Sequence, residues 1–152
     1  MSQSGKMGPS YKVGDEIRGP VRGITTSRIE WYDSAMLSAA TNELRQVGSN
    51  IHTDEEFARS EGFKGVNADG MIMTNWCSEM LVKAFGIHYL ERGSLRNKYI
   101  KPTNLGVELR VRGRVREATK GPKGGTLYTL EIWCEDQHGT KLVDGDATVE
   151  VV

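Results

Sequence analysis

The sequence has no excess of charge of either sign. Its 152 residues include 20 Lys and Arg and 20 Asp and Glu. A chain without net charge has no bulk electrostatic attraction for nucleic acid or for an anionic membrane surface. We therefore expect neither nucleic acid nor a membrane as a partner.

Cysteine and histidine are also scarce. The two cysteines, Cys77 and Cys134, lie in apolar surroundings, and their spacing is not that of metal ligands. Such residues are typical of buried free thiols in a reducing compartment. The three histidines lie far apart in the sequence and do not form a metal-binding motif. The sequence therefore implies no metal and no other cofactor.

Long hydrophobic runs are absent. The longest apolar stretch, near residues 71–85, is interrupted by polar side chains at five positions and does not match a membrane span. Residues 1–16 contain no apolar core of the kind found in signal peptides. We expect a cytoplasmic protein with a polar, flexible arm over residues 1–11 and a single domain over residues 12–152.

Two short polar motifs predict the starts of two helices. Ser27–Glu30 and Thr53–Glu56 both fit a capping box, in which a hydroxyl and a glutamate satisfy free backbone amides. The first helix is expected to run to Val47 and the second to Ser60. His52 lies on the hinge between them, where it can present an imidazole with an ordinary pKa of about 6.5 to a ligand.

A third helix is predicted over residues 70–85. It is apolar on nearly all sides, as expected of a helix buried in a core. Asp69 can cap its start, and Gly86 can end it. Gly70 is expected to offer a free N–H at the positive end of the helix dipole, or else to permit close packing. Asp69 has two possible roles as well: a helix cap, or an acid/base group that pairs with His52.

Strands account for most of the remaining chain. Apolar and polar residues alternate over residues 107–116 and again over 128–135, as in half-buried strands. The arginines of the first of these strands are interpreted as a solvated face. Further strands are expected over residues 17–24, 89–100 and 142–152. Helices followed by an antiparallel meander predict an α+β fold in which a curved sheet wraps one long helix.

The central stretch, residues 51–78, resembles the MaoC-like (R)-specific enoyl-CoA hydratase family of the hotdog fold. Three segments follow the family signature without a gap: His52-Thr-Asp54, Phe57-Ala58 and Gly70-Met71. The resemblance implies a hotdog fold and an acyl thioester as substrate. It also implies that the Gly70 amide polarises the thioester carbonyl, while His52 moves a proton to or from water.

The sequence departs from the family at several positions of this signature. Val47 occupies the position of the family's catalytic Asp, and Ser49 and Asn50 replace its Asn and Pro. Asp69 replaces the His that precedes the helix glycine, and under the lyase hypothesis it substitutes for the missing partner of His52. The residues expected to contact substrate are Ser49, Asn50, Met71, Trp76 and Ser78.

Three functions are compatible with this sequence. The first is a hydratase or dehydratase (a lyase) acting on an acyl thioester or related carbonyl compound. The second is a catalytically inactive hotdog subunit that binds thioesters beside an active homologue. The third is a thioesterase, or a biosynthetic cyclase or isomerase, on the same scaffold. The substrate is a small molecule, carried by coenzyme A, by a carrier protein or as a free acid. A homodimer is expected, because an edge strand such as residues 107–116 would otherwise be exposed.

Overall fold

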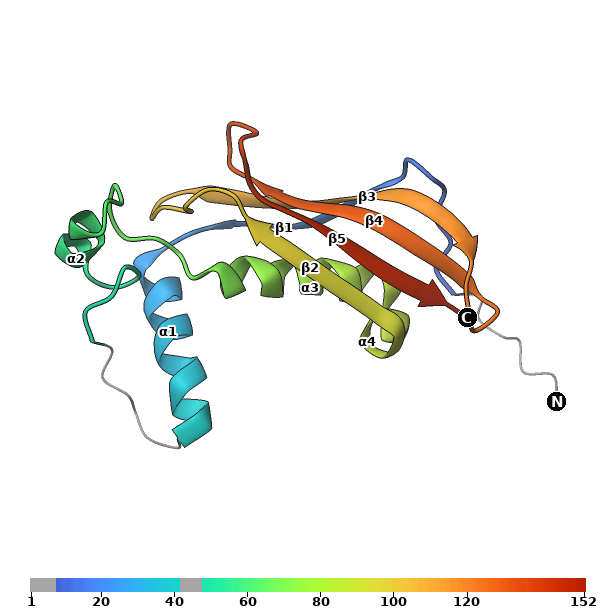
Figure 1. Ribbon diagram of the computed structural model, residues 1–152, viewed down its shortest axis with the longest axis horizontal. Helices are drawn as coiled ribbons and strands as arrows, with labels where there is room; N and C mark the ends of the chain where they lie inside the picture. The colour runs from blue at the N-terminus through green and yellow to red at the C-terminus, as the bar shows by residue number, and fades with distance from the viewer. Residues whose placement is uncertain (1–7, 42–47) are drawn as a thin grey trace.

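The computed structural model describes residues 8–41 and 48–152, with the backbone alone described for residues 34–41. The described residues form five strands and four helices. In chain order these are β1 (Glu16–Gly23), α1 (Thr26–Thr41), α2 (Glu55–Ser60), α3 (Gly70–Phe85), α4 (Ile87–Arg92), β2 (Gly93–Tyr99), β3 (Glu108–Lys120), β4 (Thr126–Glu135) and β5 (Lys141–Val151). Figure 1 shows their arrangement in space.

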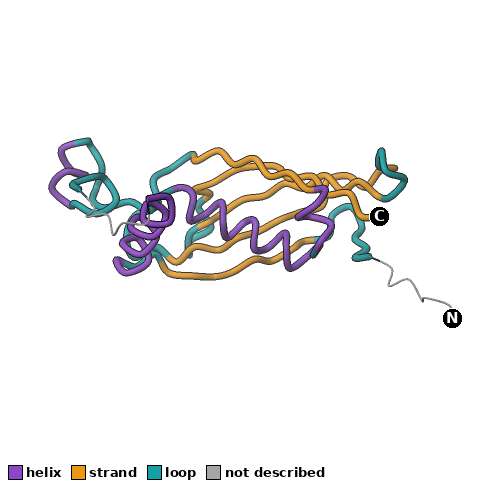
Figure 2. Tube along the Cα trace, turned by 90° about the horizontal axis from the view of Figure 1, so that it is seen from below, coloured by secondary structure: helices purple, strands orange, loops and turns teal. Residues whose placement is uncertain are grey.

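The five strands form one antiparallel sheet in the order β1-β3-β4-β5-β2. The sheet curves over α3, which runs along the strands on the concave face (Figures 1 and 2). In β3, Leu109, Val111 and Val115 are buried and point toward this helix, while the alternate residues point outward. A long helix wrapped by an antiparallel sheet confirms the α+β hotdog fold predicted from the sequence.

The core lies between α3 and the sheet. Seven side chains of α3 are buried there: Ile72, Met73, Trp76, Cys77, Met80, Leu81 and Phe85. Cys77 and Cys134 are buried free thiols, as predicted, with their Sγ atoms 3.5 Å apart. The hydrogen bond with Cys77, together with burial, raises the pKa of the Cys134 thiol. No helix in the described ranges is both long and apolar enough to cross a membrane.

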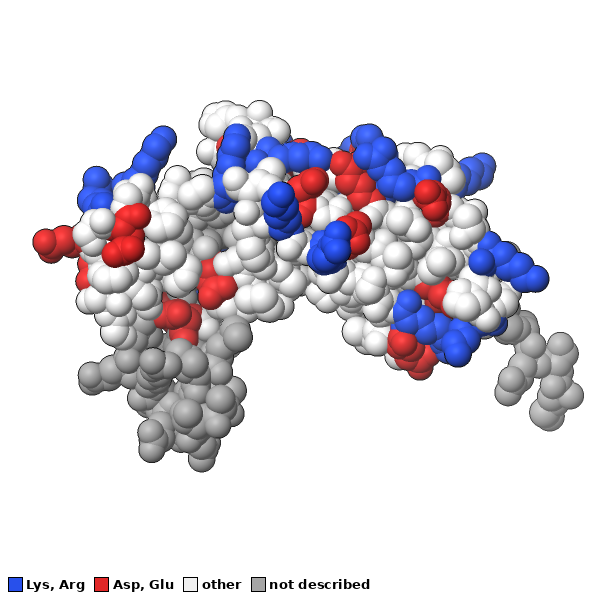
Figure 3. All heavy atoms as spheres, viewed as in Figure 1, with Lys and Arg blue, Asp and Glu red and all other residues white. Residues whose placement is uncertain are grey.

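The outer face of the sheet carries paired charges. Arg112 pairs with Glu135 on the neighbouring strand at 3.2 Å, and Arg114 pairs with Glu16 at 2.6 Å. Figure 3 shows positive and negative side chains interleaved over the sheet. The arginine row of β3 is therefore a solvated, ion-paired face, as predicted.

Both predicted capping boxes lie one or two residues away from the true caps. Helix α1 begins at Thr26, and the hydroxyl of Thr25, not that of Ser27, accepts from the Arg28 N–H at 3.3 Å. Asp54 caps α2 by accepting from the Phe57 N–H at 3.0 Å. The Thr53 hydroxyl donates instead to the side chain of Asn50. The predicted end of the first helix at Val47 lies outside the described residues.

Two other expectations need correction. Residues 87–92 form helix α4 rather than the start of a strand, because Gly86 ends α3 with a φ of 57° and the chain then makes a further helical turn. Strand β3 is not an edge of the sheet, because it lies between β1 and β4. The two edges of the sheet are β1 and β2.

The segment before β1 contacts the far end of α3. The Tyr11 ring packs against Phe85 at a centroid distance of 5.1 Å and against Tyr128 at 6.1 Å. Its hydroxyl donates to the Ala84 carbonyl at 3.1 Å. Of the arm expected over residues 1–11, residues 1–7 lie outside the description, and Tyr11 is held by these contacts.

Replacing Leu81 by alanine should test whether α3 is the core helix. Leu81 is fully buried, and its truncation should lower the free energy of unfolding by about 2–5 kcal/mol, measured by urea denaturation. Lys83→Ala is the matched control, since Lys83 lies on the same helix with its side chain 69% exposed. Lys83→Ala should lower the free energy of unfolding by less than about 1 kcal/mol. Equal losses in both variants would contradict the assignment.

Candidate functional site

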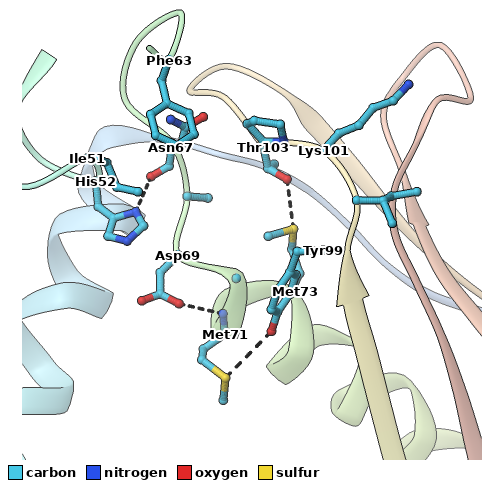
Figure 4. Close-up of a pocket in the computed structure, with 14 residues that line it drawn as sticks. Ile51, His52, Phe63, Asn67, Asp69, Met71, Met73, Tyr99, Lys101 and Thr103 are labelled. Carbon is cyan, nitrogen blue, oxygen red and sulfur yellow. Dashed lines mark hydrogen bonds between the residues drawn. The ribbon is translucent and has the colours of Figure 1, made fainter. Parts of the chain in front are cut away.

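A cavity of about 380 Å³ opens at the N-terminal end of α3 (Figure 4). Four residues predicted from the sequence line it together: His52, Asp69, Gly70 and Met71. Its other walls are mostly apolar and come from residues 51, 63, 67–68, 73 and 99–103. The fold thus brings the predicted proton-transfer residue and the predicted oxyanion donor into one cavity, although 18 positions separate them in the sequence.

His52 is held by two hydrogen bonds that fix its position and its protonated nitrogen. Its backbone N–H donates to Asn50 Oδ1 at 2.7 Å, which tightens the turn that carries it. Its ring Nδ1 lies 2.8 Å from the Asn67 carbonyl oxygen. Because a carbonyl oxygen only accepts, Nδ1 carries the proton in neutral His52. Nε2 therefore keeps a lone pair and can accept a proton.

The start of α3 presents a free backbone amide. Asp69 Oδ1 accepts from the Met71 N–H at 2.7 Å, which confirms Asp69 as the N-cap. Among the described residues, the Gly70 N–H has no hydrogen-bond acceptor. The cap therefore satisfies the second amide of the helix and leaves the first available to an oxygen at the positive end of the dipole.

Close packing gives a second reason for glycine at position 70. A Cβ atom there would lie only 2.6 Å from Cζ of Tyr99, whose ring covers the Gly70 Cα. The Tyr99 hydroxyl lies 2.6 Å from Thr74 Oγ1 on the next turn of α3, and this hydrogen bond holds the ring in place. The close-packing role and the free amide therefore coexist at Gly70.

Within the described parts of the chain, the expected pairing of Asp69 with His52 is not a direct hydrogen bond between their side chains, and Asp69 acts as a helix cap. The Asp69 charge also affects Tyr32 on α1. Burial raises the pKa of the Tyr32 hydroxyl, and the negative charge of Asp69 raises it further. In the same parts of the chain, no three His, Cys, Asp or Glu side chains are arranged to hold a metal ion.

The remaining predicted residues do not line this cavity. Asn50 supports the turn beneath His52, and the Ser49 hydroxyl bonds the Asp54 carboxylate. Ser78 donates to the Tyr89 hydroxyl at 3.1 Å, two turns further along α3. Trp76 lines a different cavity. Val47, at the position of the family's catalytic Asp, lies outside the described residues.

The wall of the cavity opposite His52 was not predicted from the sequence. This wall comes from Tyr99 at the end of β2 and from the segment that follows it, including Lys101 and Thr103. Thr103 is buried, and its hydroxyl donates to Met73 Sδ at 3.1 Å. These residues lie about 30 positions after Gly70 and share no motif with it, so no local pattern could have placed them in the site.

A double-mutant cycle tests the contact between Gly70 and Tyr99. Gly70→Ala should destabilise the protein by about 1–3 kcal/mol, because the new Cβ would overlap the tyrosine ring. In a Tyr99→Ala background, Gly70→Ala should change the free energy of unfolding only slightly, because the ring is gone and alanine favours a helix more than glycine does. Urea denaturation of the four proteins gives the comparison. An equal loss of unfolding free energy in both backgrounds would show that the Tyr99 ring is not the reason for glycine at position 70.

Comparison with known proteins supports the fold. No protein-family model matches the chain, and no curated protein sequence matches it. Among solved structures it is similar to R-hydratase PhaJ1 from Pseudomonas aeruginosa, with 21% identity, a TM-score of 0.67, and 93% of this chain and 82% of that chain covered. It is similar to the MaoC-like dehydratase from Rhodospirillum rubrum, with 21% identity, a TM-score of 0.70, and coverage of 93% and 92%.

A third similar structure contains two different chains. The ChsH1-ChsH2 complex from Mycobacterium tuberculosis matches with 14% identity, a TM-score of 0.68, and coverage of 94% of this chain and 100% of that chain. At these identities the likeness establishes a shared fold and not a shared reaction. The chain therefore has the hotdog fold of the MaoC-like (R)-hydratases and dehydratases.

Proposed function

We propose that this protein is a MaoC-like hydratase or dehydratase that acts on an acyl thioester or a related carbonyl compound. One observation carries the proposal. His52, with Nδ1 bonded to the Asn67 carbonyl, shares a cavity with the Gly70 N–H at the start of α3, which has no acceptor among the described residues. A base and an oxyanion donor in one mostly apolar cavity are the two groups that addition of water to an α,β-unsaturated thioester requires.

In the proposed hydration, water adds across the C2=C3 bond of the enoyl thioester. The water oxygen bonds to C3 while His52 Nε2 takes a proton from the water. The π electrons move toward the thioester oxygen, and the Gly70 N–H and the helix dipole stabilise the charge that develops there. The imidazolium of His52 then returns the proton to C2, which completes the addition of H and OH. Dehydration follows the same steps in reverse.

The other cavity-lining residues, and the predicted residues outside the cavity, have supporting roles in this proposal. The apolar side chains of Ile51, Phe63 and Met73 enclose the acyl group, with Met71 as a flexible wall. Asp69 orients the attacking water through its carboxylate while it caps the helix. Ser49, Asn50, Ser78 and Trp76 act on substrate binding indirectly, by fixing the turn of His52 and the packing of α3.

Hydration assays on purified protein test the proposal. With a short and a bulky enoyl-CoA as substrates, His52→Ala should lower kcat at least about 100-fold, because general acid–base catalysis is removed. His138→Ala is the matched control, since His138 lies exposed in the turn between β4 and β5. It should leave kcat unchanged. Near-native turnover in His52→Ala would refute the assignment of His52 as acid/base.

A second substitution separates the two roles of Asp69. Asp69→Asn keeps an oxygen that can cap α3 but removes the negative charge. If the carboxylate orients water, kcat should fall at least about tenfold while the unfolding midpoint stays close to that of wild type. Unchanged turnover would leave Asp69 as a helix cap only. Release of free thiol from an acyl-CoA would instead favour a thioesterase.

A second candidate function is that of a subunit without its own turnover, paired with an active homologue. Two observations favour it: Val47 stands where the family has its catalytic Asp, and among the described residues no carboxylate is hydrogen-bonded to His52. Strand β2 offers a surface for assembly, because it is an edge strand that pairs with β5 only. Two copies could pair there as a homodimer, and so could this chain and a related one.

Light scattering and activity measurements distinguish these assemblies. The lyase proposal predicts a homodimer whose turnover is lost in His52→Ala. The second candidate predicts no turnover by the chain alone, and a one-to-one complex with a MaoC-like homologue. In that complex, activity should be abolished by changes in the homologue's catalytic pair and unaffected by His52→Ala. Turnover by the purified chain alone would eliminate the second candidate.

A further inference from the structure

A second cavity, of about 540 Å³, lies on another side of α3, between that helix, α1 and the end of β1. Its walls are aromatic and cationic, formed by Trp31, Tyr32, Trp76, Ile72, Arg22 and Arg28. It shares no lining residue with the cavity of His52. The inference drawn from it therefore does not rest on the proposed hydratase activity.

The two arginines of this cavity differ in their partners. Both guanidinium groups lie over the Trp76 ring, at 5.4 Å for Arg22 and 5.5 Å for Arg28. Arg22 makes two hydrogen bonds to the Glu79 carboxylate, at 2.6 and 3.0 Å, which neutralise it. Arg28 donates to the Gly23 carbonyl oxygen at 3.0 Å and pairs with no carboxylate among the described residues. Within the described part of the chain, its positive charge is therefore not neutralised by a carboxylate at the cavity.

The aromatic side chains provide a flat surface beside this charge. Trp31 is 75% exposed although it lines the cavity. Tyr32 is fixed by its hydroxyl, which accepts from Asn75 Nδ2 at 3.1 Å. A planar group can stack on exposed indole, while an anion gains charge-assisted hydrogen bonds from the remaining N–H groups of a guanidinium.

We propose that this second cavity binds an anion that carries a flat aromatic group, with the anionic part on Arg28 and the ring against Trp31. Two sources have this shared chemistry. One is an aromatic carboxylic acid, and the other is a purine nucleotide with its phosphates. Either ligand would place an aromatic ring and a negative charge a short distance apart, as Trp31 and Arg28 are placed on adjacent turns of α1.

Binding measurements on the full chain test this site with two probes, 2-naphthoate and adenosine 3′,5′-bisphosphate. Calorimetry, together with tryptophan fluorescence, should show saturable binding of at least one probe at concentrations up to millimolar. Arg28→Gln should weaken that binding about tenfold, because the charged hydrogen bond is lost. Arg96→Gln is the matched control, since Arg96 lies on β2 with its side chain 86% exposed. It should bind as tightly as wild type.

The two probes also distinguish the sources. Tighter binding of 2-naphthoate identifies an aromatic acid, and tighter binding of the bisphosphate identifies a nucleotide. Uncharged 2-naphthamide should bind at least about tenfold more weakly than 2-naphthoate. Trp31→Ala, which leaves Arg28 in place, should also weaken binding. The proposal is overturned if wild type binds neither probe saturably, or if Arg28→Gln and Trp31→Ala both bind as tightly as wild type.

Discussion

The burial of α3 against the concave face of the sheet is the interaction on which the rest of the structure depends. Seven of its side chains lie in the core, and burial of apolar surface is the dominant favourable term in folding. This packing sets the direction and the depth of the helix. It therefore fixes where the N-terminus of α3 emerges, which is beside the turn that carries His52 and beside the chain that leaves β2. Both cavities border this one helix.

The chemistry proposed for the first cavity depends on backbone groups as much as on side chains. His52 is oriented by the Asn67 carbonyl, and no carboxylate of the described residues is hydrogen-bonded to it. The proposed oxyanion donor is a main-chain amide, that of Gly70, while Asp69 caps the neighbouring amide of Met71. In the proposed reaction, a neutral orienting group would stabilise the His52 imidazolium less than a carboxylate would, and the positive end of the helix dipole would act on the developing oxyanion.

Local sequence patterns predicted the elements better than their ends. The alternation in β3 and the apolar character of α3 identified a half-buried strand and a core helix correctly. Both helix caps were displaced because several hydroxyls and carboxylates lie close together, and the choice among them depends on other hydrogen bonds. The Thr53 hydroxyl donates to the Asn50 side chain, for example, while the Asp54 carboxylate caps the helix. Helix α4 was missed because six residues carry too little periodicity to distinguish a helical turn from a strand.

The sequence by itself determined the fold class, because the order of helices and strands indicates it. It also determined the core helix, the Asp69 cap and the presence of His52 on a hinge, because each of these depends on local patterns. Only the tertiary structure decided that Tyr99 covers Gly70, that Trp76 and Ser78 face away from the cavity of His52, and that β3 lies inside the sheet. It also decided that Arg28 and Trp31 meet Trp76 in a second cavity. These contacts join residues far apart in the chain, and their geometry is set by how the sheet curves over α3, which no local pattern encodes.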